Sequence, residues 1–256
     1  MTGGSGAVGF QRDGGLATVR VGTGRRANAL ATRDWHALAT LFEDLADDPT
    51  LRAVVLAGAG RSFFSAGSDM REWLSADPAD IDASFAAMES ALTAIERLPV
   101  PVVARIRGAA AGAGCQLACA CDLRVVADDA TLGMPIARWG ILVPPTFAAR
   151  IALLTGPASA RDLLFTGRLV DGAEAVRLGL ATTHVPEAEL DDTVTAIVTS
   201  ILAHPPAAVR AAKRSVDLLL EPARDHLRKT PTGPAADYAS MQAGLAAFLA
   251  RVTDAG

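Results

Sequence analysis

Long apolar runs are missing from this sequence of 256 residues. The longest apolar stretches are short and are broken by Gly, Pro or Arg. The first ten residues, MTGGSGAVGF, contain neither a basic segment nor an apolar run of signal-peptide length. We therefore expect a cytoplasmic protein without a membrane partner. Half of the residues are hydrophobic, which is enough to build a substantial core.

An excess of basic residues is also missing. The chain has 24 Lys and Arg against 28 Asp and Glu, a net charge of −4. Proteins that bind nucleic acids or membrane surfaces usually carry a basic patch, so neither partner is expected. A small molecule is the expected ligand.

Cysteine is scarce and confined to one alanine-rich segment. Cys115, Cys119 and Cys121 lie within seven positions, and no histidine near them in the sequence completes a metal-binding set. The sequence therefore predicts reduced, buried structural thiols and no metal site.

Strand and helix patterns alternate up to about residue 143, which predicts parallel α/β packing. From residue 144 onward only 181–185 has a strand pattern, and the rest has a helical one. The expected strands are 16–21, 52–57, 102–106, 123–127 and 131–134, and the expected helices are 32–47, 81–98 and 112–120.

The last predicted helix, about 235–252, is apolar along one face. That face carries Met241, Leu245, Phe248, Leu249 and Val252, with few charges opposite. Such a helix usually packs on the core or on a neighbouring subunit, which favours an oligomer.

Two glycine-rich segments, 64–69 and 108–116, lie where a strand is expected to pass into a helix. This geometry leaves backbone N–H groups pointing at an anion or a carbonyl oxygen. Two such donors converging on one point would form an oxyanion hole. Neither segment matches G-x-G-x-x-G followed by an acidic residue on the next strand, so a dinucleotide-binding site is not favoured.

Taken in order, segments from about residue 16 to 251 resemble those of the crotonase, or enoyl-CoA hydratase/isomerase, superfamily. The resemblance implies a spiral of repeated β-β-α units, with an α/β core carrying an acyl-CoA site over 1–190. It also implies a C-terminal helical oligomerisation region over 191–256, in a homotrimer or a dimer of trimers. The matching segments are RANAL at 26–30, FSAGSD at 64–69, 108–122, LGMP at 132–135, 165–175, GL at 179–180 and 240–248.

The resemblance also assigns roles to individual residues. The N–H groups of Ser68 and Ala113 would form the oxyanion hole, and Asp69 would be either catalytic or a cap of the following helix. Coenzyme A would enter as part of the substrate, and no tightly bound cofactor is implied. The residues implied near coenzyme A are Arg26, Ala27, Ala66, Gly67, Ser68, Asp69 and Gly112, and those implied in the substrate wall are Pro135, Ile136 and Trp139.

The sequence departs from the hydratases of this superfamily at their two catalytic glutamates, and so resembles members that lack the pair. Gln116 and Ile136 occupy those positions. Glutamine cannot change its protonation state and isoleucine cannot form a hydrogen bond. Each lost acid or base typically supplies ~10²–10⁴ in rate, so classical hydration is not expected.

Candidates for a replacement acid or base are Asp69, Glu72, Arg138 and His36, and each also has an ordinary structural interpretation. Two functions therefore stay open. One is a non-hydratase lyase, isomerase or decarboxylase acting on an acyl-CoA, and the other is a non-catalytic acyl-CoA binding protein. The apolar residues Ile141, Leu142 and Val143 near the substrate wall suggest an apolar acyl group.

Overall fold

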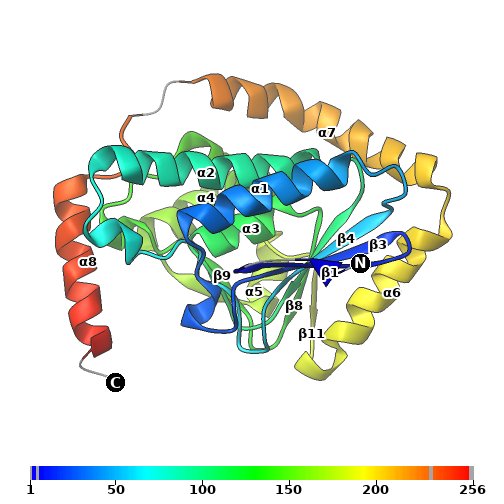
Figure 1. Cartoon of the computed structure of the whole chain (residues 1–256), viewed down its shortest axis with the longest axis horizontal. Helices are drawn as coiled ribbons and strands as arrows, with labels where there is room; N and C mark the ends of the chain where they lie inside the picture. Colours follow the sequence, from blue (N-terminus) through cyan, green and yellow to red (C-terminus); the bar gives the residue numbers. More distant parts are fainter. Residues whose placement is uncertain (1, 4–5, 231–232, 254–256) are drawn as a thin grey trace.

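Two β-sheets form the centre of the computed structural model, which describes residues 2–3, 6–230 and 233–253 (Figure 1). Within these residues the large sheet has the order β1-β2-β3-β4-β6-β8-β11, and the small sheet has the order β10-β9-β7-β5. The strands are β1 (Thr2–Gly3), β2 (Val8–Asp13), β3 (Leu16–Val21), β4 (Ala53–Gly58), β5 (Phe63–Ser65), β6 (Val102–Ile106), β7 (Ala109–Ala111), β8 (Leu123–Ala127), β9 (Thr131–Gly133), β10 (Leu169–Asp171) and β11 (Thr183–Val185).

Helices account for most of the remaining described chain. The α-helices are α1 (Thr32–Ala46), α2 (Pro78–Arg97), α3 (Ala113–Ala120), α4 (Pro145–Thr166), α5 (Gly172–Leu178), α6 (Leu190–Ala203), α7 (Pro206–Lys229) and α8 (Tyr238–Thr253). The short 3₁₀ helices are η1 (Arg26–Asn28), η2 (Glu72–Leu74), η3 (Ala137–Trp139) and η4 (Glu187–Glu189).

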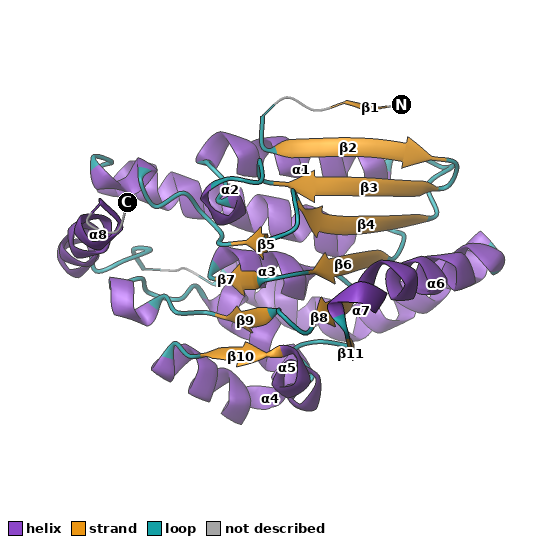
Figure 2. Cartoon of the chain, turned by 90° about the horizontal axis from the view of Figure 1, so that it is seen from below, coloured by secondary structure: helices purple, strands orange, loops and turns teal. Residues whose placement is uncertain are grey.

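The chain repeats one unit: a strand in the large sheet, a strand in the small sheet, and a helix. The successive units are β4-β5-α2, β6-β7-α3 and β8-β9-α4. Neighbouring strands of these units pair in parallel in both sheets, and Figure 2 shows β5, β7 and β9 in the same order as β4, β6 and β8. The expected spiral of β-β-α units is therefore confirmed. It places the segments that follow β5 and β7 side by side.

Helices cover both faces of the large sheet. On β4, Val54 and Leu56 lie in the main core, whereas Val55 lies in a second cluster with Leu190 and Val194 of α6. Successive side chains of a strand point to opposite faces, so a strand buried on both faces is apolar throughout. This explains the uninterrupted apolar run of β4, in which every residue is buried.

Several predicted elements are confirmed with the same bounds, among them the strands 16–21, 102–106 and 123–127. Further strands were not predicted. The segment before residue 16 contains β2, which pairs antiparallel with β3, and the segment after residue 144 contains β10 in addition to the expected β11. Pairing with a neighbouring strand stabilises both: β2 forms a hairpin with β3 across Gly14 and Gly15, and β10 pairs with β9, which is distant in the sequence.

The C-terminal region begins with α6 at Leu190 and ends with α8, which packs on its own chain. Met241 and Leu245 of α8 are fully buried, and the N–H of Asp237 donates to the carbonyl of Gly140. Phe248, Leu249 and Val252 were also expected on this face, but the structure describes only the backbone of α8 at these positions and not their side chains.

The three cysteines are buried and free, as predicted. Burial raises the pKa of the Cys121 thiol well above its ordinary value. Among the helices that the structure describes, none combines the length and apolarity that a bilayer span requires.

Candidate active site

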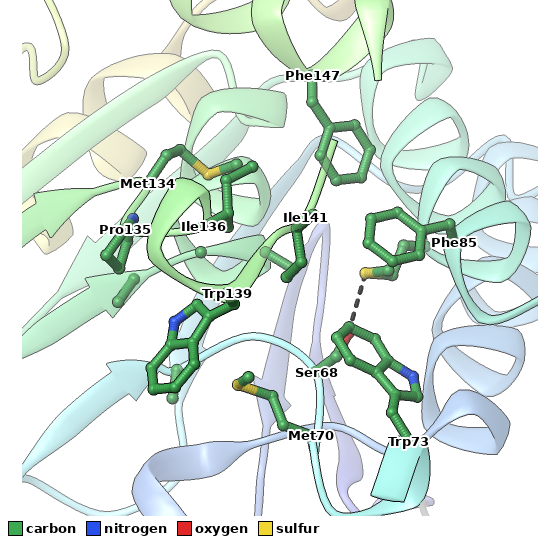
Figure 3. A pocket seen from close by; sticks show the side chains of 15 residues that line it. Ser68, Met70, Trp73, Phe85, Met134, Pro135, Ile136, Trp139, Ile141 and Phe147 are labelled. Carbon is green, nitrogen blue, oxygen red and sulfur yellow. Dashed lines mark hydrogen bonds between the residues drawn. The ribbon is translucent and has the colours of Figure 1, made fainter. Parts of the chain in front are cut away.

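One pocket lies where the two glycine-rich segments meet residues 134–147 (Figure 3). Its walls come from the loop after β5, the start of α3, helix α2 and the segment around η3. The lining residues are Ala66, Ser68, Met70, Trp73, Phe85, Met88, Ala111, Gly112, Ala113, Met134, Pro135, Ile136, Trp139, Ile141 and Phe147.

Asn28 and Ser65 hold the loop after β5 in place. Asn28 has a left-handed φ of 55°, and its buried Nδ2 donates to the carbonyls of Ala59 (2.9 Å) and Phe63 (2.8 Å). The hydroxyl of Ser65 donates to the Asn28 carbonyl at 2.9 Å and accepts the N–H of Gly67 at 3.0 Å. Every polar group named here is paired, so the loop has a fixed shape.

The same loop leaves the N–H of Ser68 without an acceptor among the described residues. The residues on either side of it pair with Leu30, whose N–H donates to the Gly67 carbonyl and whose carbonyl accepts the N–H of Asp69, both at 2.8 Å. Because bonding alternates along an extended chain, the Ser68 N–H points the other way, and Ser68 is a lining residue of the pocket.

Ala113 begins helix α3 directly after Gly112, whose φ of 56° favours glycine. The N–H groups of a first helical turn have no intrahelical acceptor, and within the described part of the chain the Ala113 N–H has none elsewhere. The two loops can approach each other closely because Gly67 has no Cβ; a Cβ added to it would lie 2.7 Å from the Ala113 nitrogen. Two unpartnered N–H donors therefore border the same pocket.

Of the two residues at the positions implied for catalytic glutamates, Ile136 and Gln116, only one borders the pocket. Ile136 lines the pocket. Gln116 is fully buried outside the lining, and its Nε2 donates to the Phe147 carbonyl at 3.1 Å. Its Oε1 has no partner in the described structure, a cost that buried polar atoms rarely bear without water or a ligand group.

Asp69 and Glu72 also lie outside the lining of the pocket. Asp69 accepts the Arg71 N–H at 3.2 Å and an Arg26 guanidinium N–H at 3.1 Å. Glu72 accepts the N–H and the hydroxyl of Thr32, at 2.8 and 3.0 Å, and so caps helix α1 from outside. Both carboxylates are thus engaged in local structure.

Arg138 and His36 do not line the pocket either. Arg138 donates to the Gly167 carbonyl at 2.9 Å, and His36 is exposed on α1. Of the residues implied near coenzyme A, Ala66, Ser68 and Gly112 line the pocket. Arg26, Ala27, Gly67 and Asp69 belong to the adjoining loops but not to the lining.

Several lining side chains were not among the sequence candidates. Three rings form a continuous wall: Trp73 and Phe85 are stacked with centroids 5.5 Å apart, and Phe85 and Phe147 lie 6.2 Å apart. Met88 lies about one helical turn after Phe85 on α2. Phe85 and Met88 belong to the helix expected over 81–98, whose apolar face indicates burial. The local sequence pattern does not show whether a buried side chain lines a pocket or lies in the core.

The chemistry of the pocket is defined by what its lining can donate and accept. None of the fifteen lining residues has an ionisable side chain. The hydroxyl of Ser68 is engaged, because it accepts from Trp35 Nε1 at 3.2 Å and donates to Met88 Sδ at 2.9 Å. The site can therefore bind and polarise an oxygen through backbone N–H groups, but its lining offers no acid or base.

Comparison with known proteins gives the same class. The sequence pattern of the enoyl-CoA hydratase/isomerase family matches residues 11–253. The chain is also 31% identical to a carnitinyl-CoA dehydratase of Escherichia coli over 217 residues, covering 84% of this chain and 83% of that one.

Solved structures agree. An enoyl-CoA hydratase/carnithine racemase from Magnetospirillum magneticum superposes with a TM-score of 0.82 at 32% identity, covering 98% of this chain and 94% of that one. An enoyl-CoA hydratase from Mycobacterium smegmatis gives 0.79 at 32% identity, with 96% and 91% covered. The chain therefore belongs to the enoyl-CoA hydratase/isomerase family, within the crotonase superfamily.

Substituting Gly67→Ala should weaken binding of butyryl-CoA by at least ~10-fold, because the added methyl group would crowd the Ala113 N–H and the φ of 91° strains any L side chain. Isothermal titration calorimetry measures the change. Gly24→Ala is the matched control, since Gly24 also has a positive φ, of 77°, but open space around its Cβ position. Equal losses in the two variants would show that backbone strain alone is responsible.

Proposed function

We propose that the protein binds the thioester of an acyl-CoA and polarises its carbonyl with the N–H groups of Ser68 and Ala113, in a reaction that uses no side-chain acid or base from the pocket. The observation that carries the proposal is the pairing of two unpartnered backbone donors with a lining free of ionisable side chains. Donors fixed before charge develops stabilise an enolate oxygen most effectively.

The electrostatics of the pocket support this function. The Ala113 N–H lies in the first turn of α3, where the helix dipole adds positive potential. The apolar surroundings keep the local dielectric low, so a hydrogen bond to a developing oxyanion is stronger than it would be in water.

A proton-transfer reaction is a poor fit to the same pocket. Hydration and double-bond isomerisation both require a group that removes a proton, and typical acids and bases contribute ~10²–10⁴ each. The names of the relatives denote hydration, dehydration and racemisation. We propose that this chain departs from those activities and belongs instead to the lyases that break a carbon–carbon bond.

Decarboxylation of an acyl-CoA with a carboxylate on its α-carbon is the lyase reaction that demands least of the protein. The bond between the α-carbon and the carboxylate breaks, CO₂ leaves, and the electron pair becomes an enolate whose oxygen faces the two N–H donors. A proton from water then reaches the α-carbon. Only oxyanion stabilisation is asked of the pocket.

A second candidate function is non-catalytic binding of an acyl-CoA. It is favoured by the engagement of the Ser68 hydroxyl with Trp35 and Met88, which leaves no side-chain hydroxyl free for chemistry among the lining residues. A hole that polarises a thioester also holds one, so both candidates share the same ligand.

The proposal extends to the coenzyme A arm, for which the loops beside Ala66 and Gly67 are the candidate surface. Arg26 is 64% exposed at its side chain and pairs with Asp69 at 3.1 Å. An exposed ion pair is worth only about 0–1 kcal/mol, so Arg26 can exchange it for a phosphate at little cost.

A mass-spectrometric turnover screen of acyl-CoAs should show CO₂ loss from methylmalonyl-CoA, giving propionyl-CoA, and little hydration of crotonyl-CoA. Ordinary enzymatic turnover is roughly 1–10³ per second. Hydration within that range would contradict the proposal, because a base would then have to reach the pocket. Binding of acyl-CoAs without turnover of any of them would support the second candidate, and turnover that survives Gly67→Ala would not depend on the two donors.

We also propose that the chain forms a trimer or a dimer of trimers, supported by the exposed apolar side chains of α7. Val216, Leu218 and Leu219 are 60%, 63% and 78% exposed, and such clustered exposure is typical of an interface. Light scattering of the parent should give three or six times the 26.3 kDa mass of the monomer, and Leu219→Lys should lower the measured mass. Phe165→Lys, at a residue 77% exposed on α4, is the matched control, and a monomeric parent would contradict the proposal.

A further inference from the structure

Two aromatic rings separate the acyl pocket from a second cavity. Phe85 and Phe147 line the pocket described above and also line a second cleft. The cleft lies between helix α2, residues 142–147 and the end of α7. Figure 3 shows the two rings next to each other at one end of the pocket, with Met70 at the opposite end.

Phe85 is partly buried and packs between the rings of Trp73 and Phe147, and Phe147 is held by further contacts. The centroids of the Phe85 and Phe147 rings are 6.2 Å apart and the ring planes are tilted by 32°, a favourable arrangement for an aromatic pair. Phe147 is 2% exposed, its carbonyl accepts Gln116 Nε2 at 3.1 Å, and the Arg150 guanidinium carbon lies 5.7 Å from its ring centroid. The pair therefore forms a fixed wall.

Arg150 is itself anchored, so the support behind Phe147 is rigid. Its guanidinium donates to both carboxylate oxygens of Glu89 at 2.8 Å and to those of Glu96 at 3.0 and 3.2 Å. Burial disfavours the charged guanidinium, but these hydrogen bonds outweigh it and raise the pKa of Arg150. A buried, bidentate network of this kind fixes geometry at the site it supports.

The cleft beyond the rings is suited to an alkyl chain. Its floor includes Leu142, Val143, Pro144 and Leu227. The acidic residues that border it are engaged: Glu89 pairs with Arg150, and Asp82 accepts the Ala235 N–H and the Tyr238 hydroxyl at 3.0 and 2.7 Å. Arg228, the basic residue that borders it, donates to Glu221 and Asp225, both at 2.6 Å. A methylene chain could therefore lie along the apolar side chains of the cleft without breaking an ion pair.

We infer that Phe85 and Phe147 form a partition that sets the length of the acyl group, and that the ligand of this site is a short acyl-CoA whose far end is apolar. This inference rests on the proposed acyl-CoA function. The pocket ends at the partition, so a longer chain has to stop short of full burial or displace two anchored rings. Without the partition, the chain would continue into the cleft.

The test compares the affinities of butyryl-CoA and octanoyl-CoA for the parent, Phe147→Ala and Phe85→Ala. The parent should bind butyryl-CoA at least as tightly as octanoyl-CoA. Each buried methylene contributes roughly fourfold in affinity. Opening the partition should therefore raise the octanoyl to butyryl affinity ratio by at least ~10-fold.

Met70→Ala is the matched control, because Met70 also lines the pocket but lies at the end opposite the rings. It should change both affinities by similar factors. Phe147→Leu provides a milder variant, since the cavity left by Phe147→Ala in a buried position weakens folding. Circular dichroism checks that each variant is folded.

Three results would overturn the partition. They are a parent that binds octanoyl-CoA more tightly than butyryl-CoA, an unchanged ratio in folded Phe85→Ala and Phe147→Leu, or an equal rise of the ratio in Met70→Ala. The first two leave the proposed acyl-CoA function intact, because butyryl-CoA still binds. Failure of the parent to bind either thioester would instead overturn the proposed function itself.

Discussion

The close approach of the two glycine-rich loops is the constraint on which the rest of the structure depends. Gly67 leaves no room for a Cβ beside the Ala113 nitrogen, and Gly114 leaves none beside the Ser65 carbonyl. The repeated β-β-α unit supplies this approach, because parallel pairing of β5 with β7 carries the two loops to the same edge of the small sheet. The fold itself therefore brings the two loops together, and among the described residues it leaves the N–H groups of Ser68 and Ala113 without acceptors.

The pocket built on this contact combines backbone N–H donors with a lining that has no ionisable side chain. The backbone donors border an apolar cavity. The carboxylates that follow Ser68 most closely in the sequence are used elsewhere: Asp69 accepts the Arg71 N–H in its own loop, and Glu72 caps the start of α1. Low polarity strengthens the interaction of the donors with a carbonyl oxygen. The same low polarity would penalise an unpaired ionised side chain, so the absence of ionisable groups from the lining is consistent with a pocket that relies on backbone donors alone.

Much of the fold could be predicted from the sequence, because the central strands β4, β6 and β8 of the large sheet are largely apolar and α1 has a clear helical period. In the small sheet β9 was predicted, but β5, β7 and β10 could not be, since they have three residues each and β7 consists only of alanine. The two loops were predicted from their glycines, and Ser68 and Ala113 were assigned as donors by the family resemblance. The wall formed by Trp73, Phe85 and Phe147 was not, because the side chains come from distant segments that local patterns mark only as buried. The position of Gln116 outside the lining likewise depends on the carbonyl of Phe147, a tertiary contact.

The most direct test of the central claim compares butyryl-CoA with its thioether analogue, S-butyl-CoA, by calorimetry. The two ligands differ only at the carbonyl, so their affinity difference isolates the contribution of the Ser68 and Ala113 N–H groups. Two net hydrogen bonds of about 0.5–1.5 kcal/mol each predict that the thioester binds roughly 5- to 150-fold more tightly. Equal affinity for the two ligands would contradict the account.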